Sequence, residues 1–163
     1  MKNITITDFC KKFDACQRGI DWAAEKLPGG MMSELWPLLI EQPEYLIWVA
    51  TQEYVFSDRD NRIMACRFVR ETPIGDGRTV WDLLTDERSR NAVIVAERYC
   101  NGEATGAELS AARAAMWAAR AEWAASRGAE WGAEWAARAA WAAWAAQAKI
   151  IMEFGNPFLG VEK

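Results

Sequence analysis

The sequence predicts an all-α protein with three parts, and two observations lead to this class. The parts are a small helical N-terminal domain over residues 1–104, an alanine- and tryptophan-rich long helix or helical hairpin over 105–154, and a C-terminal tail over 155–163. Capping residues, prolines and glycines divide the first part into segments whose apolar residues recur at helical spacing. The second part combines alanine, the best helix former, with six of the ten tryptophans.

The first segments are predicted to be short helices bounded by proline and glycine. Thr7 or Asp8 can cap a short helix, and a second helix is expected over about 15–27 before a proline and two glycines end it. The next two helices are expected to begin near Ser33 and at Pro43, because proline is tolerated in the first turn of a helix.

Longer helices are expected after these short ones. Ser57 can open one helix, and Thr85 can cap another that repeats alanine, valine and tyrosine at the spacing of one buried face. Thr105 and Glu108 have the spacing of a full capping box, which opens the alanine–tryptophan segment. Gly155 ends that segment, because glycine readily adopts the left-handed conformation that follows a helix.

On a helical wheel the alanine–tryptophan segment has two contrasting sides. One side has almost no side chains and predicts a seam through which two helices can approach closely. This helix-packing seam consists of Ala114, Ala118, Ala121, Ala125, Gly128, Gly132, Ala136, Ala139 and Ala143. The opposite side interleaves arginine with tryptophan and predicts a cation–π ladder that binds a partner. This partner-binding stripe consists of Arg113, Trp117, Arg120, Trp123, Arg127, Trp131, Trp135, Arg138 and Trp141.

The sequence leaves two questions about this segment open. Tryptophans at helical spacing are usually core residues, whereas interleaved arginines favour an interface, because arginine is rarely fully buried without a partner. The segment can also be one continuous helix or a hairpin that breaks near Gly128. We favour the continuous or gently bent helix, because the wheel phase is kept across this glycine and no proline intervenes.

Composition and charge exclude several classes of function. Residues 1–106 hold 13 Lys/Arg and 17 Asp/Glu, and residues 107–163 hold six of each, so duplex nucleic acid is not an expected ligand. No histidine is present and the four cysteines lack CxxC spacing, so no metal or other cofactor is expected. Neither a signal peptide nor a membrane-spanning helix is predicted, and free thiols favour a reducing cytoplasm.

The sequence predicts that the protein is not an enzyme. Its neighbouring carboxylates, such as Glu130 with Glu134 and Asp86 with Glu87, have simpler roles as caps, dipole partners or solvated faces than as a general acid/base pair. Cys10, followed by two lysines, is the only cysteine with neighbours that could activate a nucleophile. No glycine-rich phosphate loop occurs.

Several stretches resemble a group of uncharacterised alanine-rich helical proteins found in bacteriophages and some environmental bacteria. They are the run from Ser57 to Asp60, "RIMACRFVR" from Arg62 to Arg70 and "VWDLLTDERSRNAVIVAERYCNGEAT" from Val80 to Thr105, followed by the alanine-rich segment. The stretch "ACQRGIDWA" from Ala15 to Ala23 is similar to a short N-terminal element common in phage proteins of unknown role. The resemblance covers about two-thirds of the chain. It implies a setting in the cytoplasm of a bacterial host cell and no particular activity.

Two functional hypotheses follow from the sequence. The first is a non-enzymatic module for protein–protein interaction, which forms a homo-oligomer through its alanine seam and, in a phage setting, inhibits a host or defence protein in the manner of an anti-CRISPR. The second is a protein that binds or sequesters a small, nucleotide-like ligand at a tryptophan- and arginine-lined helical interface.

Overall fold

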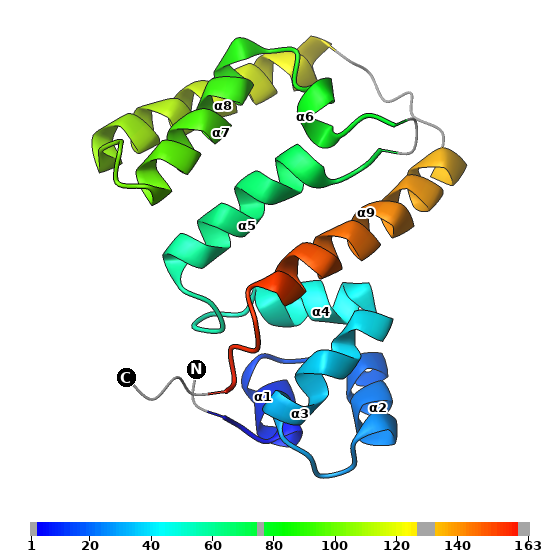
Figure 1. Ribbon diagram of the computed structural model, residues 1–163. Helices are drawn as coiled ribbons and strands as arrows, with labels where there is room; N and C mark the ends of the chain where they lie inside the picture. Colours follow the sequence, from blue (N-terminus) through cyan, green and yellow to red (C-terminus); the bar gives the residue numbers. More distant parts are fainter. Residues whose placement is uncertain (1–2, 75–76, 127–132, 160–163) are drawn as a thin grey trace. The chain divides into compact units, whose positions relative to one another are not determined.

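The computed structural model describes residues 3–74, 77–126 and 133–159, and it describes side-chain surroundings outside 119–142 (Figure 1). The described residues are mostly helical and contain no strand, which confirms the all-α prediction. Their only extended pairing is two isolated antiparallel bridges, Thr5 with Met31 and Pro73 with Thr79. Within these ranges no helix is both long enough and apolar enough to cross a membrane.

The chain forms two compact units that differ from the predicted domains. The first unit combines Met1–Ser57 with Gln147–Lys163, and the second is Asp58–Ala146. The chain passes between the units after Ser57 and after Ala146, so neither division falls at the predicted boundary after residue 104. The reason is that the end of the chain packs with the N-terminal helices.

The first unit is built from five short helical elements and the end of a sixth. They are α1 (Ile6–Lys12), α2 (Gln17–Lys26), α3 (Met32–Leu35), the 3-10 helix η1 (Trp36–Glu41), α4 (Pro43–Ala50) and the residues of α9 (Ala133–Glu153) from Gln147 onward. Two caps differ from the expected ones. Thr5 Oγ1 accepts the backbone N–H of Asp8 at 3.1 Å, ahead of the predicted capping residues. The backbone N–H of Met31 donates to Glu34 Oε2 at 2.9 Å, so the chain turns into α3 before Ser33.

The core of the first unit includes the chain's C-terminal segment. Phe158 is 0% exposed, and its ring centroid lies 5.6 Å from that of Phe9 and 5.9 Å from that of Trp36. Asn156 Nδ2 donates to the backbone carbonyl of Ser33 at 2.7 Å. Residues 156–158 are therefore part of the packed unit, although the sequence predicts a simple tail after residue 154.

The second unit contains the longer helices. They are α5 (Asp58–Glu71), α6 (Val80–Leu83), α7 (Glu87–Cys100), α8 (Gly106–Ser126) and the residues of α9 up to Ala146. α6 has no counterpart among the helices expected from the sequence. Its first turn is capped by a hydrogen bond that the Thr79 N–H donates to Asp82 Oδ2 at 2.8 Å. Asp86, next to the predicted Thr85, caps α7 by accepting the Arg88 N–H at 2.8 Å.

Candidate interaction surface

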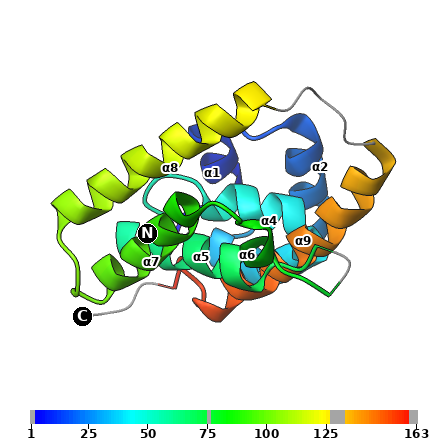
Figure 2. The same cartoon turned by 90° about the horizontal axis from the view of Figure 1, so that it is seen from above.

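The second unit holds the described beginning of the alanine–tryptophan segment, in a hairpin of α7 and α8 (Figures 1 and 2). α7 ends in a turn at Gly102, which has φ +78°. The predicted capping box then starts α8. The Thr105 N–H donates to Glu108 Oε2 at 2.8 Å, and the Glu108 N–H donates to Thr105 Oγ1 at 3.2 Å. The short turn and the box together position α8 beside α7.

One face of α8 is filled by its contact with α7. Leu109 and Ala112 are buried and Met116 is partly buried, at the i, i+3, i+7 spacing of a single helix face. They pack in one cluster with Ala92 and Val95 of α7. Over the part of α8 whose side-chain surroundings are described, the packed side chains are apolar, and Arg113, Ala114, Trp117 and Ala118 of the predicted stripe and seam are not among them.

The solvent side of α8 carries the first members of both predicted surfaces. Arg113 and Trp117 are exposed, and 59% of the Trp117 surface is accessible. Ala114 and Ala118 are exposed as well. Trp117 follows Ala114 by three positions and Arg113 by four, and Ala118 follows Ala114 by four. Residues at these spacings are neighbours on the surface of a helix. The helical wheel predicts stripe and seam on opposite sides, whereas these four members of both lie away from the face of α8 that packs against α7.

The remaining predicted surface residues fall largely outside the described side chains. Gly128, Arg127, Trp131 and Gly132 lie outside the described residues altogether, so continuity of the helix through Gly128 stays a prediction. Side-chain surroundings are not described for Arg120, Ala121, Trp123, Ala125, Trp135, Ala136, Arg138, Ala139 and Trp141. Ala143, the last seam residue, is partly buried on α9.

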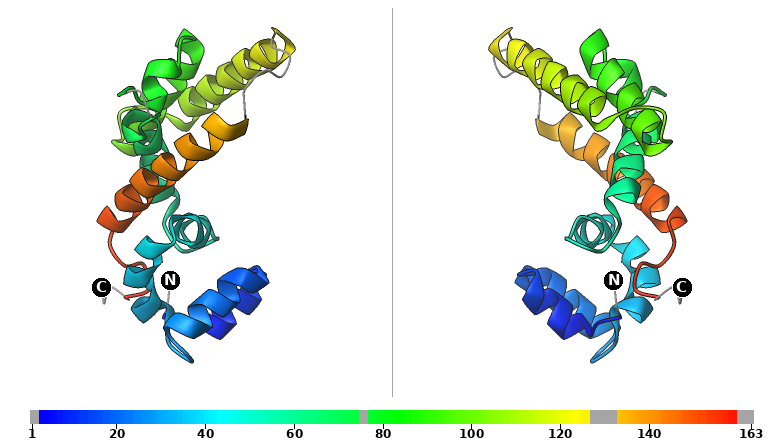
Figure 3. Two further views of the ribbon diagram at one scale, coloured as in Figure 1. Left: turned by 90° about the vertical axis from the view of Figure 1, so that its right-hand side faces the viewer. Right: turned by 90° about the vertical axis from the view of Figure 1, so that its left-hand side faces the viewer.

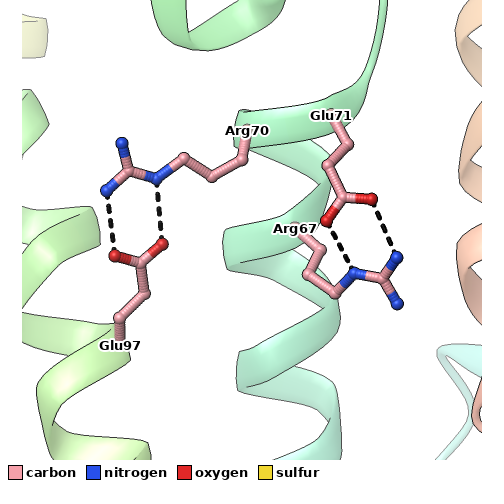
Figure 4. A network of polar contacts seen from close by, with 4 residues as sticks. All are labelled: Arg67, Arg70, Glu71 and Glu97. Atoms are coloured by element: carbon pink, nitrogen blue, oxygen red, sulfur yellow. Dashed lines mark hydrogen bonds and ion pairs between the residues drawn. The ribbon is translucent and has the colours of Figure 1, made fainter.

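Polar contacts of Arg70 fix α7, and hence the hairpin, against α5. The Arg70 guanidinium donates two hydrogen bonds of 2.9 Å to the Glu97 carboxylate of α7 (Figure 4). Its central carbon also lies 3.4 Å from the centroid of the Trp81 ring. The hydrogen bond to Glu97 raises the pKa of Arg70 further. A cation–π contact between arginine and tryptophan therefore occurs between α5 and α6. Arg70 and Trp81 are not in the predicted partner-binding stripe.

The thiols of two cysteines are kept protonated by their surroundings. Burial, together with the nearby Glu97 carboxylate, raises the pKa of Cys66 to about 11. Burial and the neighbouring Cys16 also raise the pKa of Cys10, the cysteine whose two following lysines made it the weak candidate for a nucleophile. A raised pKa lowers the thiolate fraction at neutral pH and makes Cys10 a poorer nucleophile. Among the described residues, no group of three or more Cys, Asp or Glu is placed to hold a metal ion.

The first unit contains a cavity that the sequence analysis did not predict. It has a volume of about 200 Å³ and lies among α1, α2, α3, η1 and α4. Its aromatic lining is provided by Phe9, Trp22, Tyr45 and Trp48. Apolar residues at helical spacing are the only sequence signal for these positions, and the same signal marks ordinary core residues.

Comparisons of the chain with protein-family models, curated proteins and solved structures found no match. Functional inference therefore depends on the geometry of the two units.

Proposed function

We propose that the protein is a non-enzymatic interaction module that self-associates through the solvent side of α8. The observation that carries this proposal is the 59% exposure of Trp117 on a helix whose other face is already filled by α7. Tryptophan and arginine are the residue types most enriched at binding hot spots, and Arg113 lies one turn from Trp117. An exposed tryptophan of this kind gains free energy when a partner removes it from water.

The shape of this side favours a second copy of the chain as the partner. A two-fold symmetric interface uses the same patch on both subunits, so the patch must fit itself. Here a large side chain, Trp117, lies next to two small ones, Ala114 and Ala118. In an antiparallel pair of α8 helices, Trp117 of one copy can lie over the alanines of the other. The small residues also let the helix axes approach closely.

Inhibition of a host or defence protein is a further use of this surface that the sequence resemblance suggests. The same exposed arginine and tryptophan could serve as hot-spot residues toward another protein once the dimer dissociates. In that case self-association and target binding compete for one surface.

The test is sedimentation equilibrium of the full chain over a wide range of concentrations. We expect a reversible dimer whose dissociation constant rises about thirtyfold in Trp117→Ala, the effect of a hot-spot truncation of about 2 kcal/mol. Ala118→Leu is expected to weaken the dimer as well, because the added side chain fills the space that Trp117 of the other copy occupies.

Leu159→Ala is the matched control for these variants. Leu159 is 62% exposed and belongs to the other unit, so its truncation removes a similar exposed apolar group from a different surface. The dimer of this variant should dissociate at the wild-type concentration. A wild-type protein that remains monomeric at all concentrations, or equal weakening by all three variants, contradicts the proposal.

A further inference from the structure

We propose that the cavity of the first unit binds a small, neutral aromatic molecule of one or two fused rings, with indole as the representative size and chemistry. This inference concerns a different unit from α8 and does not depend on the proposed self-association.

Two aromatic pairs line the cavity. Trp22 of α2 and Tyr45 of α4 have ring centroids 5.6 Å apart with an interplanar angle of 56°. Phe9 of α1 and Trp48 of α4 have centroids 6.1 Å apart in an edge-to-face arrangement of 87°. The side-by-side position of α1 and α2 is visible in Figure 3. The cavity thus offers a bound ring aromatic neighbours from three helices, and offset or edge-to-face contacts with them are favourable.

Part of the aromatic lining is held in position by a polar contact. The Tyr45 hydroxyl accepts a hydrogen bond from Arg18 Nε at 3.1 Å, and Arg18 Nη2 lies 2.8 Å from Glu44 Oε1. These bonds orient the Tyr45 ring before any ligand arrives. They also pair the arginine with a carboxylate outside the cavity lining, so its charge is already engaged.

Three further lining residues are aliphatic and buried. Met32, Leu35 and Leu39 are each no more than 3% exposed. A cation enclosed among these three side chains would lose its hydration, and the one carboxylate of the lining is exposed rather than buried beside them. Among the described residues that line the cavity there is no lysine or arginine, so an anionic ligand such as a nucleotide has no countercharge. A neutral apolar ligand matches this lining best.

Asp14 supplies the one carboxylate of the lining. It is exposed and follows α1 in the left-handed conformation, with φ +52°. Its exposure indicates that the carboxylate lies where the cavity meets solvent. A carboxylate accepts hydrogen bonds, so it can bind the N–H of a ligand such as indole whose ring lies deeper.

The volume sets the size of the ligand. A cavity of roughly 150 Å³ lined by apolar side chains binds benzene. The cavity of about 200 Å³ has room for somewhat more than a single ring. Gly19 increases this space, because its missing side chain leaves an opening toward Cys16 and Tyr45. A Cβ at this position would lie 3.5 Å from Cys16 Sγ and 3.9 Å from Tyr45 Cε1, which are ordinary contact distances. The glycine can therefore be replaced without a clash at Cβ.

The experiment uses the full chain labelled with ¹³C in its methionine methyl groups. Met32 lines the cavity, whereas Met64 and Met116 belong to the second unit and serve as internal controls. Titration with indole should move the Met32 methyl resonance saturably, because the ring current of a bound aromatic acts at short range. Choline and AMP, tested in parallel, represent the cationic and anionic ligand classes and should leave it in place.

Substitutions at Gly19 test the location. Gly19→Met should weaken indole binding by at least about tenfold, because methionine can fill irregular apolar space. Gly19→Ala should weaken it less and should not harm folding, since alanine is the better helix former. Glu25→Met adds the same side chain at an exposed position of α2 and should bind indole like the wild type.

Three results would overturn the proposal. The first is the absence of a saturable Met32 shift with indole, or an equal shift of Met64 and Met116. The second is unchanged indole binding in Gly19→Met, verified as folded by circular dichroism. The third is saturable binding of choline or AMP in place of indole, which would assign the cavity to a charged ligand.

Discussion

At the residue scale, Arg70 combines an ion pair between helices with a cation–π contact. Arg70 and Arg67 both form bidentate pairs, but Arg70 pairs with Glu97 of another helix, whereas Arg67 pairs with Glu71 one turn away on the same helix (Figure 4). Arg70 also lies over the Trp81 ring. The ring face adds a cation–π contact to the bidentate pair of Arg70, and this contact stabilises beyond the ion pair itself. The contacts of Arg70 also join three helices, so their loss affects tertiary structure.

We predict that Arg70→Ala lowers the free energy of unfolding by about 1–2 kcal/mol, and Arg67→Ala by only about 0.3–0.5 kcal/mol. Urea denaturation of the two variants beside the wild type measures both values. Arg70→Lys should recover less than half of the loss, since a lysine keeps the charge but cannot form the two-pronged pair. Equal losses in Arg70→Ala and Arg67→Ala would show that the ring and interhelical contacts contribute nothing.

The raised pKa of Cys66 makes the free energy of unfolding of the second unit depend on pH in the alkaline range. Burial raises the pKa of its thiol in the folded protein from about 9 to about 11. The folded state therefore holds this proton more tightly than the unfolded state. Its contribution to stability is fully present below pH 9 and is lost as the pH rises toward 11.

We predict that the free energy of unfolding falls more steeply between pH 9 and 11 in the wild type than in Cys66→Ala. Denaturation curves at several pH values measure the two slopes. Val95→Ala also removes a buried group of this unit but no ionisable one, so it should keep the wild-type slope. Identical slopes in wild type and Cys66→Ala would contradict the prediction.

Residue-level expectations from the sequence succeed where the interaction is local. The Thr105–Glu108 capping box was predicted from spacing alone, because both partners lie within one turn of helix. The contact between Arg70 and Trp81 was not, since a loop separates the two residues and only the fold brings them together. The same holds for the cavity, whose aromatic residues come from three helices.

At the element scale, α8 shows how the local pattern can mislead about packing. The alternation of alanine and tryptophan suggested that one of these two types makes the buried face. In the described part of the helix, the buried face is made by Leu109, Ala112 and Met116, which belong to neither the predicted seam nor the predicted stripe. The reason is that the position of the neighbouring helix decides which face of α8 is buried. α7 contacts α8 at this face through Ala92 and Val95. Small residues on both helices allow close approach at this face.

We predict that Ala112→Leu lowers the free energy of unfolding by roughly 1–3 kcal/mol, because the added carbons have no room between α7 and α8. Ala118→Leu makes the same change on the exposed side of the same helix and should alter the stability of the monomer by less than about 0.5 kcal/mol. Thermal denaturation at a concentration below that of self-association measures both. A larger loss in Ala118→Leu than in Ala112→Leu would mean that the faces of α8 are assigned in reverse.

Short elements were harder to predict than long ones. α6 spans only Val80–Leu83, which is too short for a periodic apolar pattern, and its cap pairs Thr79 with aspartate, although the usual box ends in glutamate or glutamine. Near Pro37 the chain adopts a 3-10 helix after one α-helical turn. This is a common form for short connecting pieces, which hydrophobic spacing alone does not separate from an α-helix.

At the scale of the whole molecule, the division into units depends on where the chain's end returns. The sequence indicates a boundary at the start of the alanine–tryptophan segment, because composition changes there. The first unit instead includes residues from Gln147 onward, whose Ile150, Ile151 and Phe158 are buried. Such a long-range closure has no local signal, since an apolar residue near the chain's end can pack on many surfaces. The residues of α9 are divided between the units, with those up to Ala146 in the second and those from Gln147 onward in the first.

We predict that Phe158→Ala destabilises the first unit by about 3–5 kcal/mol, because it empties a fully buried site between Phe9 and Trp36. Hydrogen exchange followed by mass spectrometry should show lost protection in peptides from 3–57, while peptides from α7 and the start of α8 keep theirs. Leu159→Ala, a neighbouring truncation at an exposed position, should leave both regions protected. Faster exchange in both units of Phe158→Ala would instead mean that α9 couples them into one cooperative structure, because local opening free energies follow the cooperative units of a protein.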